Sequence, residues 1–371
     1  MNLSKNLVIA ALFTAWMLAS NARPAVGQIF SYMPNESSQH EGTWLQWPHH
    51  FTYGVQHRKD VESSWVEMTR VLVQSENVHI IAFNNKERSR ITNVLRRARV
   101  PMARVDFVIR RSDDFWVRDN GPIFVHDLFN GQLTIADWGF NGWGLDAPYT
   151  RDNTVPIGIA NQHLFPRYDL NELVIEGGAF EVDGNGVLMA ARSSILEPRR
   201  NPGWPQRDVE SYLTEILGVA KFIWLDGSDG GAVDITDMHI DGFARFGLPD
   251  TLVTMERRDL QYWGLSDQDI NRLYAASDVN GKQYKQVFLP LTQRNVRTTY
   301  GYNTRVKGSY VNFYTSNGHV LMPTYGDPND AVAKQRLQAA FPNRTVVGID
   351  FRNAYRDGGM VHCVTQQQPA E

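Results

Sequence analysis

A recurring order of predicted elements in the second half of this sequence limits the folds open to it. Each copy reads as strand, strand, helix and strand. The strands are short runs rich in β-branched and aromatic residues, and the helices carry apolar residues at three- and four-residue spacing. The three clear copies are 174–182, 187–191, 208–217 and 221–225; then 239–246, 251–255, 267–276 and 286–291; then 309–315, 319–323, 330–340 and 345–349.

Two looser copies precede these three. The predicted elements are a strand, helix and strand at 42–47, 57–76 and 78–83, a helix and strand at 87–97 and 104–109, and a hairpin at 122–126 and 132–138. Copies of roughly 50–70 residues predict a pseudo-symmetric closed array, rather than a doubly wound sheet. Residues 30–369 are therefore expected to form a single α/β domain, in which loops from several units meet near a central axis.

Cys363 is the only cysteine of the chain, so it has no intramolecular disulfide partner. It follows the flexible pair Gly358-Gly359 and lies in a run with β propensity. A lone thiol accompanied elsewhere by histidine and acidic residues is a candidate nucleophile. The competing interpretation is an inert buried cysteine, since free cysteine is among the most buried residue types.

His239 and Asp241 open one predicted strand, and a side-chain period of two would place them on the same face. A histidine beside a carboxylate is suited to proton transfer near neutral pH, although a structural hydrogen-bonded pair has the same pattern. Asp234 and Asp237 precede this pair. Three acidic residues beside one histidine favour a pocket for a cation.

Two further stretches place acidic residues at the ends of predicted strands. The loop 113–122 contains Trp116 and Asp119, and an indole beside a carboxylate suits a planar cation. A capped turn with a core tryptophan is the alternative. Glu176 ends the apolar run 173–175, where a carboxylate needs a partner, either a histidine ring or a structural arginine.

Five stretches follow one another in a specific order over nearly the whole chain, from about Met33 to Pro369. They are Trp44-Leu45-Gln46-Trp47-Pro48, Trp116-Val117-Arg118-Asp119, Glu176-Gly177-Gly178, His239-Ile240-Asp241 and Gly359-Met360-Val361-His362-Cys363-Val364-Thr365-Gln366-Gln367-Gln368-Pro369. Together they resemble the agmatine deiminase family, which shares a superfamily with the bacterial peptidylarginine deiminases. The resemblance implies the pentein fold, an α/β propeller with a pseudo-fivefold array of ββαβ units around a central active site.

The resemblance also implies roles for five residues. Cys363 would attack the central carbon of a guanidinium group, while Asp119 and Asp241 would each hold guanidinium nitrogens. His239 would protonate the departing ammonia and then activate water, and Glu176 would orient His239. A resonance-stabilised cation is a poor electrophile and needs a strong nucleophile such as a thiolate. No metal and no organic cofactor is expected.

Trp116 and Asp237 complete the expected substrate-binding set, together with Asp119 and Asp241. Many agmatine deiminases read Asp-Glu-Thr-Asp-Gly-His before the active histidine, whereas this chain has Ile235 and Met238 at the second and fifth positions. The loss of an acidic side chain there affects how the far end of a substrate is held. Agmatine is the favoured substrate, and peptidyl-arginine is the alternative.

Residues 1–22 predict a secretory signal peptide, with Lys5, a short apolar core at 7–18 and a small-x-small cleavage site at Ser20-Asn21-Ala22. The core is too short for a spanning helix of ~20 residues, although an uncleaved anchor stays open. The mature protein is therefore expected to be secreted. A formal net charge of −3 with mixed signs indicates neither a nucleic acid nor an anionic membrane as a partner.

Two further classes of function stay open. One is a non-catalytic protein that binds guanidino compounds or polyamines. The other is a metal hydrolase, because His49-His50 with His362, His239 and Asp241 could ligate zinc. Against zinc, no His-x-x-x-His pair lies on a predicted helix, and Cys363 would be an isolated ligand.

Overall fold

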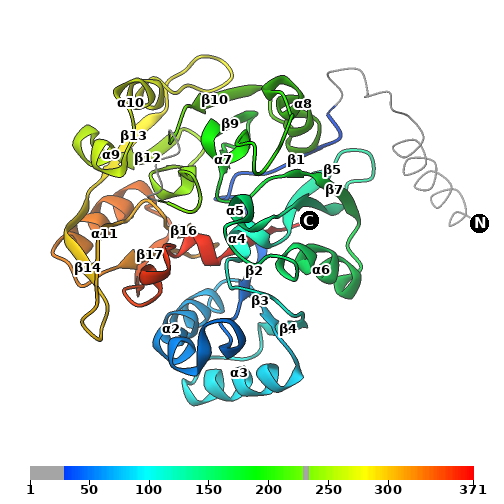
Figure 1. Ribbon diagram of the computed structural model, residues 1–371, viewed down its shortest axis with the longest axis vertical. Helices are drawn as coiled ribbons and strands as arrows, with labels where there is room; N and C mark the ends of the chain where they lie inside the picture. The colour runs from blue at the N-terminus through cyan, green and yellow to red at the C-terminus, as the bar shows by residue number, and fades with distance from the viewer. Residues whose placement is uncertain (1–28, 229–233) are drawn as a thin grey trace, which may run out of the picture.

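The computed structural model describes residues 29–228 and 234–371, which form five blades around a central axis (Figure 1). In every blade an antiparallel strand pair is followed by a strand that runs parallel to the second, with helix between the two parallel strands. The predicted closed array of ββαβ units is confirmed. The predicted signal peptide, 1–22, lies outside the described residues.

The first blade is closed by the C-terminus of the chain. Its last strand in sequence, β19, pairs antiparallel with β2, while β2, β3 and β4 run parallel to one another. The ring therefore begins and ends in the same sheet. The elements of this blade are β2 (His40–Gln46), α2 (His50–Leu72), β3 (Asn77–Ala82), α3 (Asn85–Arg97), β4 (Val105–Ile109) and β19 (Gln366–Pro369).

The other four blades follow in chain order around the ring. The second contains β1 (Ser31–Tyr32), β5 (Ile123–Asp127), β6 (Leu133–Gly139), α6 (Val155–His163) and β7 (Arg167–Val174); the third, β8 (Phe180–Val182), β9 (Val187–Ala191), α8 (Gln206–Leu217) and β10 (Lys221–Leu225); the fourth, β11 (Ala244–Phe246), β12 (Thr251–Met255), α9 (Arg257–Trp263), α10 (Asp267–Tyr274) and β13 (Lys285–Leu289); the fifth, β16 (Tyr314–Thr315), β17 (His319–Thr324), α11 (Asn329–Ala340) and β18 (Thr345–Asp350).

Short helices and one hairpin complete the chain. The hairpin β14 (Leu291–Arg297) and β15 (Asn303–Ser309) lies between the fourth and fifth blades. The short elements are α4 (Val117–Asn120), α5 (Gly142–Leu145), α7 (Arg192–Ile195) and the 3-10 turns η1 (Asp152–Thr154), η2 (Ile240–Gly242), η3 (Ala354–Asp357) and η4 (His362–Val364).

The third blade illustrates how the sequence determines these elements. Val209 and Leu213 lie one helical turn apart on α8 and are fully buried against the sheet. The helix ends at Gly218, whose φ of 70° is left-handed and suits glycine. Strands β9 and β10 then run parallel over five residue pairs, as expected for a strand–helix–strand connection.

Several predicted elements differ from the structure. The predicted strand 239–246 is wrong in its first half, where the chain turns as η2 before β11, because Gly242 N–H and Phe243 N–H bond back to carbonyls within the turn. The predicted strand 174–182 is interrupted by the turn that contains Glu176. The hairpin β14–β15 was not predicted, and α2 begins at His50 instead of residue 57.

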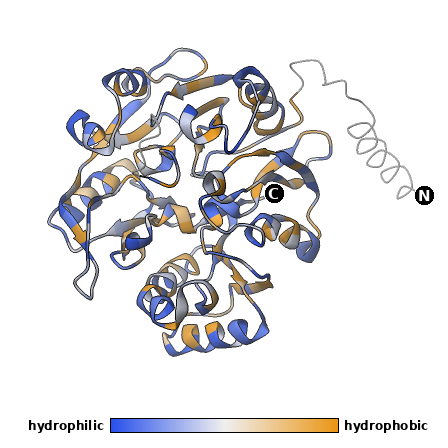
Figure 2. Ribbon diagram, viewed as in Figure 1, coloured by the Kyte–Doolittle hydropathy of each residue, from blue (hydrophilic) through white to orange (hydrophobic). Residues whose placement is uncertain are grey.

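Apolar side chains fill the spaces between sheets and helices. Figure 2 shows apolar residues on the strands and polar residues along outer helices such as α3. The largest buried cluster joins the first, fourth and fifth blades, and two smaller clusters lie in and around the second and third. Among residues 29–228 and 234–371, no helix has the length and apolar character needed to cross a membrane.

Candidate active site

Three predicted site residues converge on Gly178, in the turn between β7 and β8. A methyl group at this glycine would lie 2.7 Å from Nδ1 of His239, 2.8 Å from Oδ1 of Asp119 and 3.0 Å from Oδ2 of Asp241. Real Cβ contacts are not this short, so the position needs a residue without a side chain. Gly178 also binds two of these residues through its backbone, since its N–H donates to Asp119 at 3.0 Å and its carbonyl accepts from Asp241 N at 3.3 Å.

His239 forms a buried pair with Glu176. Its Nε2 lies 2.8 Å from Oε2 of Glu176, and its Nδ1 lies 3.7 Å from Oδ1 of Asp119. Burial by itself would lower the pKa of His239, but the negative charges of Asp119, Glu176 and Asp241 outweigh it and raise the pKa to about 9. The imidazole is therefore protonated at neutral pH and is ready to donate a proton.

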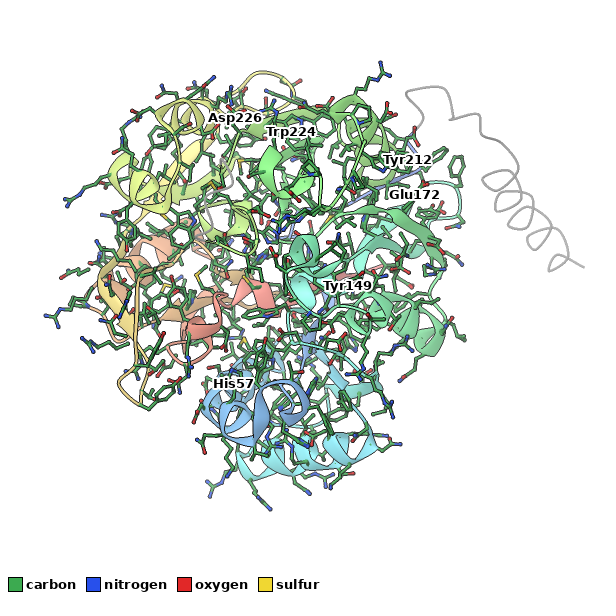
Figure 3. All side chains as sticks on the ribbon, in the orientation of Figure 1. His57, Tyr149, Glu172, Tyr212, Trp224 and Asp226 are labelled. Carbon is green, nitrogen blue, oxygen red and sulfur yellow. The ribbon has the colours of Figure 1, made fainter. Side chains whose placement is uncertain are left out.

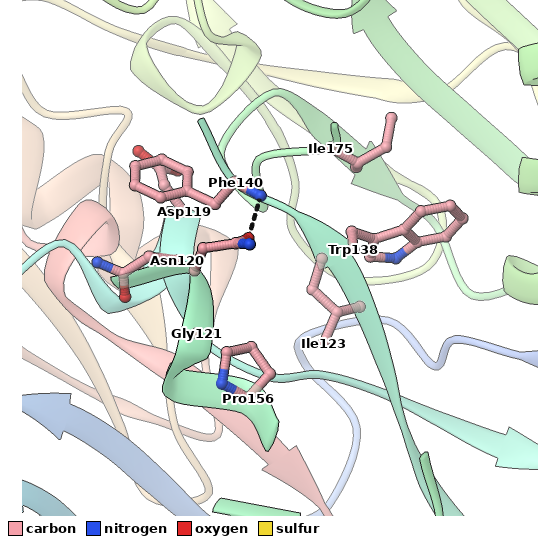
Figure 4. Close-up of a pocket in the computed structure, with 9 residues that line it drawn as sticks. Asp119, Asn120, Gly121, Ile123, Trp138, Phe140, Pro156 and Ile175 are labelled. Atoms are coloured by element: carbon pink, nitrogen blue, oxygen red, sulfur yellow. Dashed lines mark hydrogen bonds between the residues drawn. The ribbon is translucent and has the colours of Figure 1, made fainter. Parts of the chain in front are cut away.

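Asp119 lies on α4 and accepts hydrogen bonds at both oxygens. Gly178 N–H binds Oδ1, and the indole Nε1 of Trp143 donates to Oδ2 at 3.0 Å. Burial is the main reason that the pKa of Asp119 rises to about 6. Figure 4 shows Asp119 beside the small pocket lined by Asn120 and Phe140, where α4 meets the strand β6.

Asp241 lies in η2 and is held by the residue that precedes the cysteine. Nδ1 of His362 is 2.7 Å from Oδ2 of Asp241. Burial would raise the pKa of Asp241, but the hydrogen bond and charge of His362 lower it below the ordinary value. Asp241 is therefore ionised at neutral pH. Asn312 donates to its backbone carbonyl at 3.2 Å.

Cys363 lies in η4 with its thiol directed at Asp241 and Asn312. The sulfur is 3.8 Å from Oδ2 of Asp241, and Nδ2 of Asn312 donates to it at 3.4 Å. Burial, reinforced by the negative charges of Asp241 and Asp119, holds the pKa of this thiol well above its ordinary value. Without a bound cation, the sulfur is protonated at neutral pH.

A buried ionic network beneath η4 was missed by the sequence analysis. His362 contacts Glu36 as well as Asp241, with Nε2 of His362 at 2.8 Å from Oε2 of Glu36. Glu36 also pairs with Arg118 at 3.1 Å and Arg245 at 2.8 Å. Both ring nitrogens of His362 thus face carboxylates, and both hydrogen bonds form only when the ring carries two N–H groups. No local motif indicates this network, because its members come from distant parts of the chain.

Trp116 and Asp237 occupy different positions around the site. Trp116 is buried at the start of α4 against Gly359, where a methyl group would lie 2.2 Å from Cζ3 of the indole. The carboxylate of Asp237 binds Nη1 of Arg200 at 2.5 Å and Nη2 of Arg199 at 3.4 Å. Their roles as substrate ligands stay predictions.

The histidines considered for zinc have different hydrogen-bond partners. His49 contacts Ser112 through Nε2 at 3.2 Å, whereas His362 and His239 each bind carboxylates near the central axis of the propeller. Within the described residues, no group of three or more His, Cys, Asp and Glu side chains is arranged to hold a metal ion.

Sequence reasoning also missed three residues that support the site: Asn312, Trp143 and Arg200. Asn312 contacts the thiol, Trp143 binds Asp119, and Arg200 binds Glu176. The Gly-rich setting of Trp143 was visible in the sequence, but its contact with Asp119 depends on a left-handed backbone, with a φ of 56° at Trp143 itself. Asn312 and Arg200 lie in loops without a recognisable pattern.

The arrangement as a whole suits a planar cation beside a nucleophile. The buried carboxylates of Asp119 and Asp241 and an imidazole with a raised pKa meet at one glycine, and the thiol lies 3.8 Å from Asp241. Carboxylates in such a position bind guanidinium through charge-assisted hydrogen bonds. A five-bladed ββαβ ring with this centre defines the penteins that act on guanidino groups.

Known proteins place the chain within this class. The profile of the family described as Porphyromonas-type peptidyl-arginine deiminase matches residues 32–369. Agmatine deiminase from Pseudomonas aeruginosa is 33% identical over 361 residues, which cover 91% of this chain and 95% of the relative. The chain belongs to this family of pentein deiminases, to which agmatine deiminases belong, and it is a hydrolase acting on guanidino C–N bonds.

Solved structures agree with this assignment. Agmatine deiminase of Enterococcus faecalis superposes with a TM-score of 0.80 at 28% identity, covering 94% of this chain and 99% of that structure. A substrate-bound agmatine deiminase of C. jejuni superposes with a TM-score of 0.77 at 25% identity, with the same coverage of 94% and 99%. The expected pentein fold and family are confirmed.

Proposed function

We propose that this protein hydrolyses agmatine to N-carbamoylputrescine and ammonia, a step toward putrescine. The observation that carries the proposal is the convergence of His239, Asp119 and Asp241 on Gly178, with the sulfur of Cys363 3.8 Å from Oδ2 of Asp241. The names of the similar proteins, which include a P. aeruginosa agmatine deiminase, support agmatine as the substrate.

The first chemical step forms a covalent intermediate. Asp119 and Asp241 hold the guanidinium nitrogens, so that the central carbon lies in line with the sulfur of Cys363. The thiolate attacks this carbon and forms a C–S bond. One C–N bond then breaks as His239 donates its proton to the departing nitrogen, and ammonia leaves a thiouronium on Cys363.

The second step returns the enzyme to its starting state. His239, now neutral, takes a proton from a water molecule as its oxygen adds to the thiouronium carbon. The C–S bond then breaks with its electron pair going to sulfur, and the proton of the new hydroxyl passes to the departing sulfur, so the thiol is restored and the carbon keeps the oxygen as a urea carbonyl. Glu176 holds the ring through the 2.8 Å bond to Nε2, which leaves Nδ1 on the side of Asp119.

The substrate itself activates the thiol in this proposal. Burial and the charges of Asp241 and Asp119 keep the thiol protonated in the free enzyme. A guanidinium bound between these carboxylates supplies a positive charge beside the sulfur and lowers the pKa of the thiol. The thiol then releases its proton to solvent, so the nucleophile forms only when a cation is bound.

The test is ammonia release by the purified protein with agmatine, free arginine and an arginyl peptide, in the presence of reductant and EDTA. Turnover of agmatine, together with its loss in Cys363→Ser, is the expected result. Activity that survives Cys363→Ser would overturn the nucleophile assignment. Binding of agmatine without turnover would favour a non-catalytic binder, and sensitivity to EDTA would favour a metal hydrolase.

A second candidate substrate is arginine within a peptide or protein. Ile235, 43% exposed, takes the position of the acidic residue in the Asp-Glu-Thr-Asp-Gly-His pattern, so this chain lacks one charge suited to a terminal ammonium. Peptide amides are neutral and do not need that charge. Conversion of the arginyl peptide to its citrulline form, without turnover of agmatine, would establish this alternative.

We also propose that the mature protein is exported. The proposal relies on the sequence pattern of residues 1–22 alone, with cleavage after Ala22. Fractionation followed by N-terminal sequencing tests it. An intact N-terminus on protein recovered only from the cytoplasm would overturn the proposal.

A further inference from the structure

Arg200 connects the two stretches that carry the His239–Glu176 pair. Its Nε donates to both oxygens of Glu176, at 2.9 and 3.0 Å, and its Nη1 donates to Oδ2 of Asp237 at 2.5 Å. Nη2 donates to the carbonyl of Thr236 at 3.3 Å. The Arg200 side chain is fully buried, and all three of its nitrogens face protein acceptors.

Glu176 needs the positive charge of Arg200 because its own carboxylate is almost completely buried. Only 1% of the residue is exposed, and an unpaired carboxylate there would carry a large desolvation cost. Oε1 of Glu176 is bound by Arg200 alone among the hydrogen bonds of the described residues, whereas Oε2 is shared between Arg200 and His239. Arg200 therefore fixes the carboxylate orientation that presents Oε2 to the imidazole.

The segment that leads into His239 has a strained backbone. Asp237 and Met238 both have positive φ angles, 53° and 72°, which side-chain-bearing residues rarely adopt. Among the contacts that hold this segment, Asp237 pairs with Arg200, its carbonyl accepts from Ser193 Oγ at 2.7 Å, and the buried Met238 side chain packs at Gly264. His239 follows immediately, so its ring position depends on these contacts.

From these contacts we propose that Arg200 is a positioning residue for the deimination reaction. It clamps the segment 236–239 to Glu176, so that the imidazole of His239 faces the reacting carbon and keeps an ionised partner. Asp237 acts in this arrangement through Arg200 and the loop. The inference builds on the proposed roles of His239 and Glu176 and goes beyond them, because Arg200 touches neither the thiol nor the guanidinium-binding carboxylates.

The variants Arg200→Gln and Arg200→Lys test the clamp, with Arg199→Gln as a matched control. Arg199 is adjacent in sequence and also contacts Asp237, at 3.4 Å, but its other contacts are with Asp146 and Glu197. Arg200→Gln should lower kcat by about 10²-fold while KM changes little, because a small misplacement of His239 affects the chemical step more than binding.

The pH dependence of kcat separates a positioning role from a merely structural one. Loss of Arg200 removes the main opposing charge that holds the pKa of Glu176 below its ordinary value despite burial. Glu176 then protonates at higher pH, and the acid limb of kcat should move up by about 1–3 pH units in Arg200→Gln. Arg200→Lys keeps the charge and should leave the limb nearer its original position, and Arg199→Gln should not move it. The other charged groups around Glu176 are His239, Asp119, Asp241 and Asp237.

A second readout does not depend on turnover. The proton on Nε2 of His239, bound to Glu176, gives a far-downfield NMR signal, which is assigned by its absence in His239→Asn. On acidification this signal should be lost at higher pH in Arg200→Gln than in the unaltered protein, as Glu176 becomes neutral. If the protein turns over no guanidino substrate, the proposed function fails, and this signal still decides the role of Arg200.

Two results would overturn the inference. One is an Arg200→Gln variant that is folded, by circular dichroism and thermal unfolding, and whose acid limb and imidazole signal are unchanged. The other is an equal shift in Arg199→Gln, which would assign the effect to the Asp237 contact alone. If Arg200→Gln does not fold, Arg200→Lys is compared with Arg199→Gln, and a kcat for Arg200→Lys equal to that of the control contradicts the clamp.

Discussion

At the scale of single residues, burial raises the pKa of the Cys363 thiol, which also lies beside negative charges that raise it further. The sulfur of Cys363 lies 3.8 Å from Oδ2 of Asp241, and the negative charges of Asp241 and Asp119 disfavour a thiolate. The same carboxylates are the groups suited to hold a guanidinium. One pair of acidic residues thus suppresses the thiolate in the free protein and favours it once a cation is bound. This would protect the thiol from oxidation, which proceeds through the thiolate.

Alkylation of Cys363 by neutral iodoacetamide tests this account, because the chain has no other cysteine. The pKa of the thiol lies well above 9.0, so the rate should keep rising as pH increases through 9.0 without a plateau. Asp241→Asn removes one negative charge and should move this rise to lower pH by about one unit or more. A plateau below pH 8 in the unaltered protein would contradict the prediction.

The raised pKa of Asp119 predicts how kcat/KM falls at low pH. Its pKa is raised by burial from 3.8 to about 6, so it is ionised above pH 6 and loses its charge as the pH falls below that value. The quantity kcat/KM, which reports on the free enzyme, should therefore fall below about pH 6. Trp143→Phe removes the donor to Oδ2, so it should move this limb to higher pH.

Replacing Asp119 shows how much its negative charge contributes to kcat/KM. Asp119→Asn should lower kcat/KM by about 10²-fold or more, since truncating a buried, hydrogen-bonded charge pair has effects of this size. Steady-state kinetics with agmatine measures both effects. If kcat/KM is independent of pH between 5 and 8, Asp119 is not a ligand of the cation.

At the scale of elements, the candidate site residues lie in short turns and not in the strands of the blades. Asp119 is in α4, His239 precedes η2, which contains Asp241, and Cys363 is in η4. Backbone polar groups in such turns are free of sheet pairing and bind side chains instead, as Gly178 N–H does with Asp119. The strands therefore fix where each turn lies, and the turns fix the direction of each side chain.

Gly178→Ala tests this dependence on close backbone approach. The added methyl group would lie 2.7 Å from Nδ1 of His239, so the imidazole and Asp119 must move apart. A fall in kcat of about 10²-fold is expected, with a small loss of thermal stability. Gly247→Ala is the control, because its nearest contacts are at 3.3 Å from apolar side chains away from the site. Equal activity in the two variants would contradict the geometry.

The sequence predicted regular elements better than it predicted these turns. Residues 187–191, 221–225 and 251–255 form strands with the predicted bounds, because a continuous apolar run between turn signals is typical of a buried strand. The run around Cys363 has similar β propensity but forms η4, where Val364 N–H bonds back to Val361. Propensity describes local preference, whereas the path of this turn is set by its neighbours.

The candidate site residues could be named from motifs, but their mutual contacts could not. His239 and Asp241 were placed on one face of a strand, and this argument is wrong, although both side chains do reach the centre. The pairing of Glu36 with Arg118 and Arg245 joins segments 82 and more than 200 residues apart. Such pairs leave no periodic pattern, so only the fold reveals them.

At the scale of the whole molecule, each junction between blades contributes to one central site. Asp119 follows β4, Glu176 follows β7, His239 follows β10, Asn312 follows β15, and Cys363 follows β18. The central site is thus assembled from all five junctions of the ring. The closing contact is β19 on β2, directly after η4, which carries the thiol.

Side chains add to this closure at both ends of the chain. Trp44 on β2 donates to Oε1 of Gln368 at 3.0 Å, and Arg118 donates to Oε1 of Gln367 at 2.8 Å. A second tie joins α2 to η3, where Nε2 of His57, labelled in Figure 3, lies 2.8 Å from Oδ2 of Asp357. These contacts hold η3 and η4 against the first blade, and with them the stretch that contains Cys363.

Removal of residues 366–371 should therefore open the ring. The deletion exposes one edge of β2, removes the buried pairs of Gln366 with Trp44 and Gln367 with Thr43, and deprives Arg118 of an acceptor. Several buried hydrogen bonds at about 1 kcal/mol each predict a loss of about 3–5 kcal/mol in the free energy of unfolding. Activity should be lost as well, because Cys363 would lie two residues from a free chain end. Thermal unfolding and ammonia release measure both effects.

The control removes Glu371 alone, which lies beyond β19 and should change neither the stability nor the activity. An active truncated protein with an unchanged melting temperature would show that the blades do not need closure to assemble the site.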